Sequence, residues 1–286
     1  MHHPFTLTAE RPDGERLTLT QLHSAYTVTY TGFGPVGAEV ATSSRGTANG
    51  NKINSARRGG RNIVLNVYIH GNVEQNRIRL YRFFTPGHMV RLYYRNGSRD
   101  VYTEGVVESF PADQFVPAQT AQISILCESP YWAGAQEIAQ DISNVVSAFR
   151  FPFAIPAAGV PISSIVSHDY VNMYNAGDEP TGFTVTIFAR EDVTAPVIYN
   201  AITNEALRVT GVLMKGHTMT INTNTGSKRV TITDPAGNVA NAIHRKQTES
   251  TWLQLSAGDN YIAYAADAGA ESMLVTLRHR DLFVGV

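Results

Sequence analysis

Few residues of this 286-residue chain have types and spacing that could do chemistry. Residues 32–37, Gly-Phe-Gly-Pro-Val-Gly, match the G-x-G-x-x-G pattern, in which backbone N–H groups at a helix N-terminus hold a dinucleotide pyrophosphate. Pro35 removes one of those donors, and residues 38–51 have the composition of a loop or strand rather than a helix. We therefore interpret residues 32–37 as a turn that ends a strand.

The sequence shows neither a recognisable nucleophile nor a metal site. The single cysteine, Cys127, lies on the apolar face of a predicted strand, which favours a buried thiol over a reactive one. The nine histidines include no His-Glu-x-x-His pair, and zinc needs three or four converging ligands. Neither a Gly-x-Ser-x-Gly motif nor a paired set of carboxylates stands out. We predict no catalytic residue, no cofactor and no metal, and therefore no enzyme.

Arginine gives the strongest electrostatic signal. Residues 45–99 contain ten arginines and one lysine, whereas the only acidic residue among them is Glu74. Arginine binds carboxylates and phosphates through two parallel hydrogen bonds. Three interpretations are open: solvated surface charges, a contact with an acidic protein or a neighbouring subunit, and nucleic acid, which has the least support because no reading motif accompanies the charge. The candidate assembly-interface residues are Arg57, Arg58, Arg61, Arg91, Arg95 and Arg99.

Two tryptophans, Trp132 and Trp252, are candidates for stacking on a sugar ring. Tryptophans of β-sandwiches more often pack in the core or at its rim, where the indole N–H finds a partner. Trp252 lies just before a predicted tight turn at residues 256–260. We keep Trp252 as a candidate glycan contact, and carbohydrate binding as the alternative function.

Alternation of apolar and polar residues predicts that the chain is mainly β. Ile63, Leu65, Val67 and Ile69 share one face of a strand, and many other segments repeat this period of two. One amphipathic helix is predicted over residues 73–84, with Asn72 as its N-cap, and a second, weaker one over residues 136–148.

A β-hairpin is predicted around Asn96-Gly97, a dipeptide that accepts positive φ at both central turn positions. A two-residue turn there places Arg95 opposite Ser98, Tyr93 opposite Asp100 and Leu92 opposite Val101. Val90, Leu92 and Val101 then share the apolar face. Arg91 and Arg95 flank Asp100 diagonally on the other face.

Composition and charge divide the chain near residue 132. Residues 1–132 hold 13 Lys and Arg against 10 Asp and Glu, and residues 133–286 hold 10 against 14. We predict an N-terminal domain over residues 1–135 and a C-terminal domain over residues 136–286. A net charge of −1 argues against a general polyanion binder, and 43% apolar residues argue against wholesale disorder. No secretion signal or membrane span is recognisable, which predicts a soluble protein made in the cytoplasm.

The order of short motifs along the chain is more specific than any one of them. The N-terminal half runs from Arg61-Asn62-Ile63-Val64-Leu65 through His70-Gly71, the predicted helix and the Asn96-Gly97 hairpin to residues 104–109 and 122–132. The C-terminal half continues with residues 175–183, 221–226, 255–260 and 283–286. In this order the sequence resembles the distal tail protein (Dit, Sipho_tail) family of siphophages, from about Leu17 to the end.

The resemblance implies a fold of two β domains. The N-terminal domain would be a β-barrel-like belt with one helix, and the C-terminal domain a galectin-like β-sandwich. Ring-forming contacts belong to the belt domain in this family.

The resemblance also implies a structural role as a baseplate hub. Family members form a homo-hexameric ring at the tail tip, with the tail-tube protein on one side and a tail-associated lysin, fibre or hub protein on the other. The second domain can carry a receptor-binding protein, and DNA meets the ring only in transit through its lumen. The protein would be part of the virion, assembled in the host cytoplasm, with no membrane partner.

Overall fold

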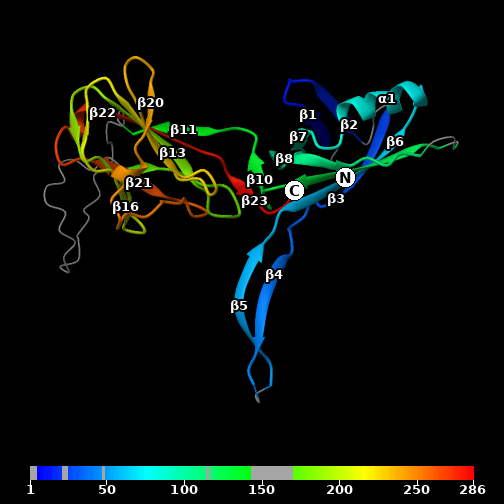
Figure 1. The fold of residues 1–286 in the computed structure, drawn as a ribbon, viewed down its shortest axis with the longest axis horizontal. Helices are drawn as coiled ribbons and strands as arrows, with labels where there is room; N and C mark the ends of the chain where they lie inside the picture. The colour runs from blue at the N-terminus through cyan, green and yellow to red at the C-terminus, as the bar shows by residue number, and fades with distance from the viewer. Residues whose placement is uncertain (1–4, 21–24, 47–48, 114–115, 117, 143–169) are drawn as a thin grey trace. The chain divides into compact units, whose positions relative to one another are not determined.

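The computed structural model describes residues 5–286 except 21–24, 47–48, 114–115, 117 and 143–169 (Figure 1). The chain divides into two compact units. The first contains residues 1–136 together with Leu282–Val286, and the second contains Glu137–Asp281. The last five residues therefore belong to the first unit, whereas the sequence placed them in the C-terminal domain. No described helix is long and apolar enough to cross a membrane.

The first unit is built on a nine-stranded antiparallel sheet. Seven strands follow the order β2-β1-β7-β8-β9-β6-β3, and β10 pairs with both β8 and β23. The strands are β1 (Thr6–Glu10), β2 (Arg16–Thr20), β3 (Tyr26–Thr31), β6 (Arg61–Ile69), β7 (Met89–Arg95), β8 (Asp100–Ser109), β9 (Thr120–Cys127), β10 (Trp132–Gly134) and β23 (Leu282–Phe283).

One face of this sheet forms the core of the first unit. In β6, Ile63, Leu65, Val67 and Ile69 are buried as the alternation predicts, and Cys127 on β9 is a buried free thiol. Helix α1 (Val73–Phe83) adds Leu80 and Phe83 to the same cluster. The predicted helix is confirmed, and its N-cap is Asn72, whose side chain accepts the Gln75 backbone N–H.

The sheet stays open at both ends. In the described residues β2 and β3 are the terminal strands of the seven-strand path, and they do not pair with each other. The mainly β composition with one α-helix is therefore confirmed, but the strands do not close into a barrel.

The β7–β8 hairpin shows that the predicted register is wrong by two residues. Arg95 pairs with Asp100, and Leu92 pairs with Thr103. The Asn96 N–H donates to the Arg99 carbonyl oxygen at 2.9 Å, and the Asn96 side chain accepts the backbone N–H groups of Ser98 and Arg99, so the turn is centred on Gly97-Ser98, one residue later than predicted. A shift of two leaves every side chain on its predicted face, so Val90, Leu92 and Val101 are still buried together.

A separate two-stranded hairpin joins β4 (Ala38–Ser44) to β5 (Asn51–Arg58). Every residue of both strands is exposed, and the ribbon leaves the nine-stranded sheet of its unit (Figure 1). The glycine-rich residues 32–37 lead from β3 into this hairpin, which confirms them as a turn at a strand end. Gly32 has a φ of +82°, and a Cβ there would lie 2.0 Å from the carbonyl oxygen of Asn62.

The second unit is a β-sandwich of two antiparallel sheets. The six-stranded sheet, in the order β11-β22-β13-β18-β19-β20, contains β11 (Ile138–Asp141), β13 (Phe183–Ala189), β18 (Thr218–Asn222), β19 (Arg229–Thr233), β20 (Val239–Asn241) and β22 (Met273–His279). The four-stranded sheet, in the order β12-β21-β15-β16, contains β12 (Val171–Asn172), β15 (Val197–Asn200), β16 (Glu205–Arg208) and β21 (Tyr261–Ala265). Short elements complete the unit: β14 (Val193–Thr194), β17 (Val212–Leu213) and the 3-10 turns η1 (Ile243–Arg245) and η2 (Ala270–Ser272).

The two sheets of the second unit share one hydrophobic core. Phe183, Val185 and Ile187 of the six-stranded sheet lie in the same buried cluster as Ile198 and Ile262 of the four-stranded sheet. This arrangement agrees with the β-sandwich predicted for the C-terminal domain.

The weaker helix predicted over residues 136–148 is wrong where the structure describes it. Ile138–Asp141 form strand β11, which pairs with β22 from Ile138 opposite His279 to Asp141 opposite Thr276. Residues 143–148 lie outside the described residues. Pairing with β22 gives this segment backbone hydrogen-bond partners, so tertiary pairing overrides a weak helical preference here.

Candidate assembly interface

The predicted interface arginines occupy three places in the first unit. Arg57 and Arg58 lie on the exposed hairpin, Arg91 and Arg95 lie on β7 with Arg99 in the following loop, and Arg61 begins β6. The structure brings Arg91 and Arg95 onto one face of β7, but it separates Arg61 from the others by burying it.

Arg61 lies in the interior and is removed from the candidate interface. Its side chain is 1% exposed, and its guanidinium donates hydrogen bonds to the carbonyl oxygens of Gly32 (2.5 Å), Gly34 (2.7 Å), Pro130 (2.6 Å) and Val284 (2.9 Å). Burial lowers the pKa of this guanidinium, which nonetheless stays protonated at neutral pH. Four partially negative carbonyl oxygens therefore solvate the charge in place of a carboxylate.

The buried position of Arg61 could have been found in the sequence. It precedes Ile63, Leu65, Val67 and Ile69 in the same period of two, and all five are buried. The residues that hold it come from two loops and the C-terminal tail, however, and no local pattern in the sequence connects these segments.

The hairpin arginines remain on the surface. Arg57 forms an ion pair across the hairpin with Glu39 at 2.9 Å. Arg58 donates to the Tyr131 hydroxyl at 3.3 Å, and its guanidinium lies 5.7 Å from the centre of that ring. Both side chains are solvent-exposed, so they are accessible to another protein chain.

The β7–β8 arginines pair with acids on the neighbouring strand. Arg91 donates to Glu104 at 2.6 Å and to the Tyr93 hydroxyl at 3.1 Å, and these two partners raise the pKa of the guanidinium. Arg95 lies 3.8 Å from Asp100, and the Arg99 guanidinium lies 4.0 Å from the centre of the Phe283 ring. Exposed pairs of this kind contribute little to the stability of the fold, about 0–1 kcal/mol each. These arginines can therefore bind a partner chain in place of their own acids at little cost to stability.

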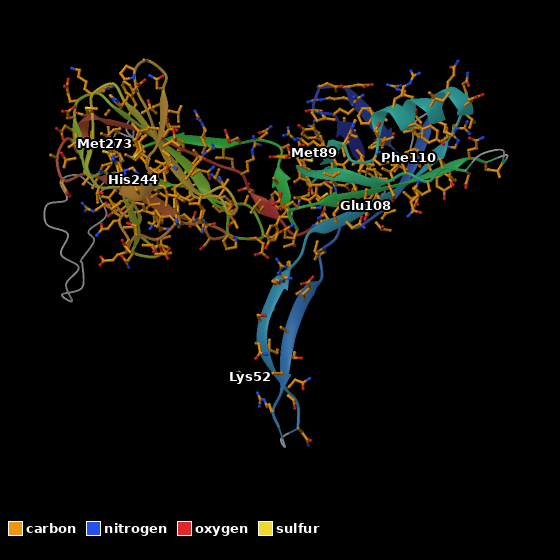
Figure 2. The ribbon with its side chains drawn as sticks, in the orientation of Figure 1. Lys52, Met89, Glu108, Phe110, His244 and Met273 are labelled. Carbon is orange, nitrogen blue, oxygen red and sulfur yellow. The ribbon has the colours of Figure 1, made fainter. Side chains whose placement is uncertain are left out.

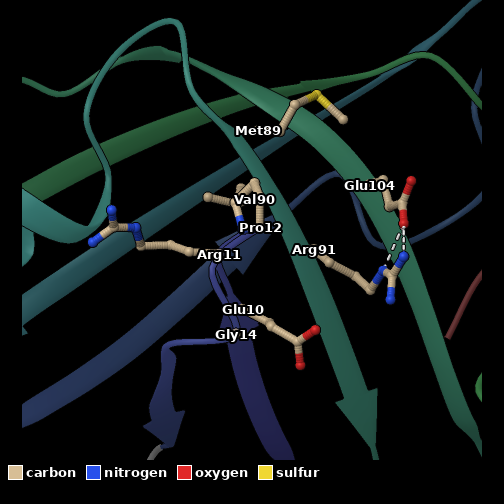
Figure 3. Close-up of a pocket in the computed structure, with 8 residues that line it drawn as sticks. All are labelled: Glu10, Arg11, Pro12, Gly14, Met89, Val90, Arg91 and Glu104. Atoms are coloured by element: carbon tan, nitrogen blue, oxygen red, sulfur yellow. Dashed lines mark hydrogen bonds and ion pairs between the residues drawn. The ribbon is translucent and has the colours of Figure 1, made fainter.

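A shallow pocket adjoins Arg91 and is shown in Figure 3. It encloses about 370 Å³ between the β1–β2 turn and the β7–β8 pair. Its lining combines two acids and two arginines with apolar side chains, and consists of Glu10, Arg11, Pro12, Gly14, Met89, Val90, Arg91 and Glu104. Sequence reasoning did not find this pocket, because its two walls are far apart in the chain.

The two tryptophans have different surroundings. Trp132 is fully buried and donates its indole N–H to the Phe33 carbonyl oxygen at 3.2 Å, so it is a core residue. Trp252 is half-buried against the core of the second unit, and the Lys246 ammonium lies 5.6 Å from the centre of its ring. A glycan contact at Trp252 stays a prediction. Among the described residues no cluster of three or more His, Cys, Asp or Glu side chains could hold a metal ion.

A buried histidine in the second unit predicts a pH dependence of stability. His279 has Nε2 3.4 Å from Asp281, and burial, partly opposed by that carboxylate, lowers its pKa below the ordinary value of 6.5. The folded state therefore favours the neutral imidazole. This preference contributes fully to the stability of the unit at pH values above the pKa of His279 in the unfolded chain. The contribution is lost as the pH falls below that pKa. We expect the urea midpoint of the second unit, followed by Trp252 fluorescence in a Trp132→Phe background, to fall between pH 7.5 and pH 5.5 by less with His279→Leu than without it.

The control for this measurement is His244→Leu, which replaces an exposed histidine of the same unit. His244 is labelled in Figure 2. Its replacement should leave the pH dependence of the midpoint unchanged. An equal loss of midpoint in His279→Leu and in the unchanged protein would contradict the assignment.

Comparison with known proteins finds one family model that matches part of the second unit. Residues 176–281 match the family model for the siphovirus-type tail component, C-terminal domain. These residues cover most of the sandwich, from the loop after β12 to the end of the unit. This part of the chain is similar to a siphophage tail-component domain. The resemblance to the distal tail proteins drawn from the sequence is thereby confirmed.

Solved structures extend the likeness in fold to almost the whole chain. The crystal structure of Dit (gp 19.1) from phage SPP1, described as a paradigm of the hub adsorption apparatus in phages that infect Gram-positive hosts, superposes with a TM-score of 0.67. The two chains are 14% identical over 98% of this chain and 99% of that one. The chain therefore has the Dit fold, and the predicted fold class is confirmed.

Baseplate structures give the same fold with lower similarity. The baseplate of phage P2 in its activated conformation with Ca matches with a TM-score of 0.54 and 9% identity over 98% of each chain. The phage p2 baseplate with Sr matches with a TM-score of 0.52 and 9% identity, over 97% of this chain and 98% of that one. No curated protein sequence matches the chain. The chain is thus similar in fold to the distal tail and baseplate proteins of siphophages over nearly its whole length.

Proposed function

We propose that this protein is a non-enzymatic distal tail protein whose copies, six in number, close into a ring at the tail tip. The ring joins the tail tube to the tail-tip lysin, fibre or hub protein, supports the receptor-binding apparatus, and lets DNA pass through its centre. The observation that carries this proposal is the likeness in fold to SPP1 Dit over 98% of the chain.

The open sheet of the first unit supports the proposal. Its end strands, β2 and β3, leave edges that the described chain does not pair with each other. Exposed sheet edges promote uncontrolled association unless they are covered. A closed ring of heterologous contacts would cover such edges in every copy and leave none free to extend.

The hairpin β4–β5 supports it independently. A two-stranded hairpin is marginally stable in water when no other surface packs on it. All the residues of β4 and β5 are exposed, so within the described chain the hairpin gains almost nothing from burial. Contact with another copy or with a tail partner would supply the burial that it lacks.

The experiment is to purify the protein and measure its mass by light scattering, then image it by negative stain. We expect a particle several times heavier than 31.3 kDa with a central hole. A monomer at every concentration, both alone and with the tail-tube protein added, would contradict the proposal. Turnover of cell-wall material by the purified protein would contradict its non-enzymatic part.

The double substitution Arg91→Glu with Arg95→Glu tests the arginine interface. Both side chains point away from the core, where each faces an acid across the β7–β8 pair. We expect assembly to weaken about tenfold or more, because reversing two rim charges turns attraction to an acidic neighbour into repulsion. Light scattering across a concentration series measures this change, and circular dichroism checks that the fold is kept.

The matched control is Lys228→Glu with Arg229→Glu, which reverses two exposed basic side chains in the second unit. It should leave assembly unchanged. Normal rings in the Arg91 and Arg95 variant, or loss of its fold as a monomer, would remove these residues from the interface.

A further inference from the structure

Three large apolar side chains lie in line across the outer face of the nine-stranded sheet. Met89 on β7 is directly opposite Val106 on β8, and Val106 is directly opposite Leu126 on β9. They are 45%, 37% and 52% exposed. We call Met89, Val106 and Leu126 the apolar row. Cross-strand neighbours are close enough to act as one patch, so this face offers continuous apolar surface to a partner.

Polar groups border the apolar row on both sides. Along β7 and β8, Arg91 and Glu104 form the next cross-strand pair and are joined by an ion pair. On the other side, Glu108 accepts a hydrogen bond from the Ser124 hydroxyl at 2.8 Å. An apolar centre with a charged border is the composition of a protein–protein contact. Figure 2 labels Met89 and Glu108 on this sheet.

The hairpin β4–β5 has the complementary composition. Val40 and Ile53, one on each strand, are 50% and 68% exposed. The two strands carry three basic residues, Lys52, Arg57 and Arg58, and a single acidic one, Glu39. The register places Val40, Ile53 and Arg58 on one face of the ribbon and Lys52 and Arg57 on the other, and all five side chains are exposed. Lys52 is labelled on the ribbon in Figure 2.

We propose that the hairpin β4–β5 of one copy packs on the apolar row of the next copy. Val40 and Ile53 would bury Met89, Val106 and Leu126, and Arg58, on the same face of the ribbon, would approach Glu108 on the side of the row away from Arg91. The inference rests on the proposed ring, and it names the two surfaces that meet in it. Such a contact joins different surfaces on the two copies, so repetition leads around a ring rather than to a symmetric pair.

The dimensions of the two surfaces agree. Neighbouring strands are about 4.8 Å apart, so the three strands of the apolar row span about 10 Å from first to last. A two-stranded ribbon with its side chains has a similar width. Ribbon and sheet would pack face to face, with both backbones keeping their present hydrogen bonds.

Leu126→Glu tests the sheet side of the contact. An unpaired carboxylate at the β9 end of the row loses its hydration on assembly, so we expect association to weaken about tenfold or more. Ile202→Glu is the matched control, because Ile202 is 53% exposed on the second unit. The control should assemble like the unchanged protein. Both variants are compared by light scattering across a concentration series, with circular dichroism to verify folding.

Cross-linking tests which surfaces meet. Protein with Ile53→Cys is mixed with protein with Val106→Cys, allowed to exchange subunits, and treated with a short bis-maleimide. We expect a covalent dimer in the mixture and none in either protein alone. Mixing Ile53→Cys with Ile202→Cys is the control and should give no dimer. Cys127 can stay in all of these proteins because it is buried.

The possible results separate the two proposals. Rings without the Ile53–Val106 cross-link, or full assembly of Leu126→Glu, would overturn the hairpin contact and leave the ring intact. A monomeric unchanged protein would overturn the ring itself, and the hairpin contact with it. A cross-link formed equally in the Ile202 control would also overturn the contact, because it would show that the reaction does not depend on position.

Discussion

Replacing Arg61 with methionine is expected to lower the free energy of unfolding of the first unit by about 3–5 kcal/mol, which is a large part of the stability of an ordinary domain. The substitution keeps the length of the side chain but removes every donor. The carbonyl oxygens of Gly32, Gly34, Pro130 and Val284 would then be left without this partner. Hydrogen bonds from a charged donor are worth more than neutral ones, and acceptors buried without a partner are costly.

The Arg61→Met measurement uses urea unfolding followed by tryptophan fluorescence. A background with Trp252→Phe leaves Trp132 as the one indole, so that the signal reports the first unit. Arg61→Lys is informative because an ammonium keeps the charge but lacks the planar fork, and we expect it to restore less than half of the loss. Arg57→Met, on the exposed hairpin, is the matched control and should change stability by less than about 0.5 kcal/mol. An Arg61→Met protein as stable as the unchanged one would disprove the structural role.

Trp132→Ala is expected to cost the first unit about 3–5 kcal/mol, the range found when a buried aromatic side chain is truncated. Trp132 is fully buried, its ring contacts Phe33 at 5.0 Å between centres, and its N–H is bound to the Phe33 carbonyl oxygen. Loss of the ring would leave a cavity beside the loop that Arg61 also holds. Hydrogen exchange of first-unit peptides measures the change without needing the missing fluorophore. Trp132→Phe should recover part of the loss, since it refills the space without the hydrogen bond.

The two substitutions should not be additive. The Arg61 guanidinium lies 5.4 Å from the centre of the Trp132 ring, and both residues fix the turn at residues 32–34. Side chains in contact commonly show interaction energies of about 0.5–3 kcal/mol. We expect the double variant to lose less than the sum of the single losses. Strict additivity would mean that the two residues hold the loop independently.

Much of the fold followed from local patterns. Alternation identified the buried face of β6, and the capping residue and periodicity placed α1 within one residue of its observed end. These features depend on neighbours in the sequence, and one sequence is enough to show them. The hairpin register did not follow, because the hydrogen bonds that the Asn96 side chain accepts from Ser98 and Arg99 move the turn one residue along the chain.

The arginine cluster shows why a site is harder to predict than a fold. Ten arginines in one window indicate charge, but the direction of each side chain is set by the strand, helix or loop that carries it. Arg91 and Arg95 lie on the outer face of the sheet, whereas Arg61 is buried on the inner face. The same excess of arginine in the sequence therefore includes both surface residues and a structural residue of the core. The apolar row escaped notice for a related reason. Met89, Val106 and Leu126 become neighbours only through strand pairing, and each is an isolated apolar residue in the sequence.

The return of the C-terminal tail to the first unit has a practical consequence for engineering. Strand β23 pairs Phe283 with Trp132 of β10, and Arg61 holds the Val284 carbonyl oxygen. The second unit is thus inserted between two strands of the first and is tethered at both ends. A replacement module would have to be joined to the first unit at both ends, near residues 136 and 282, with the final five residues kept. A simple truncation after residue 136 would remove a strand from the unit that it was meant to isolate.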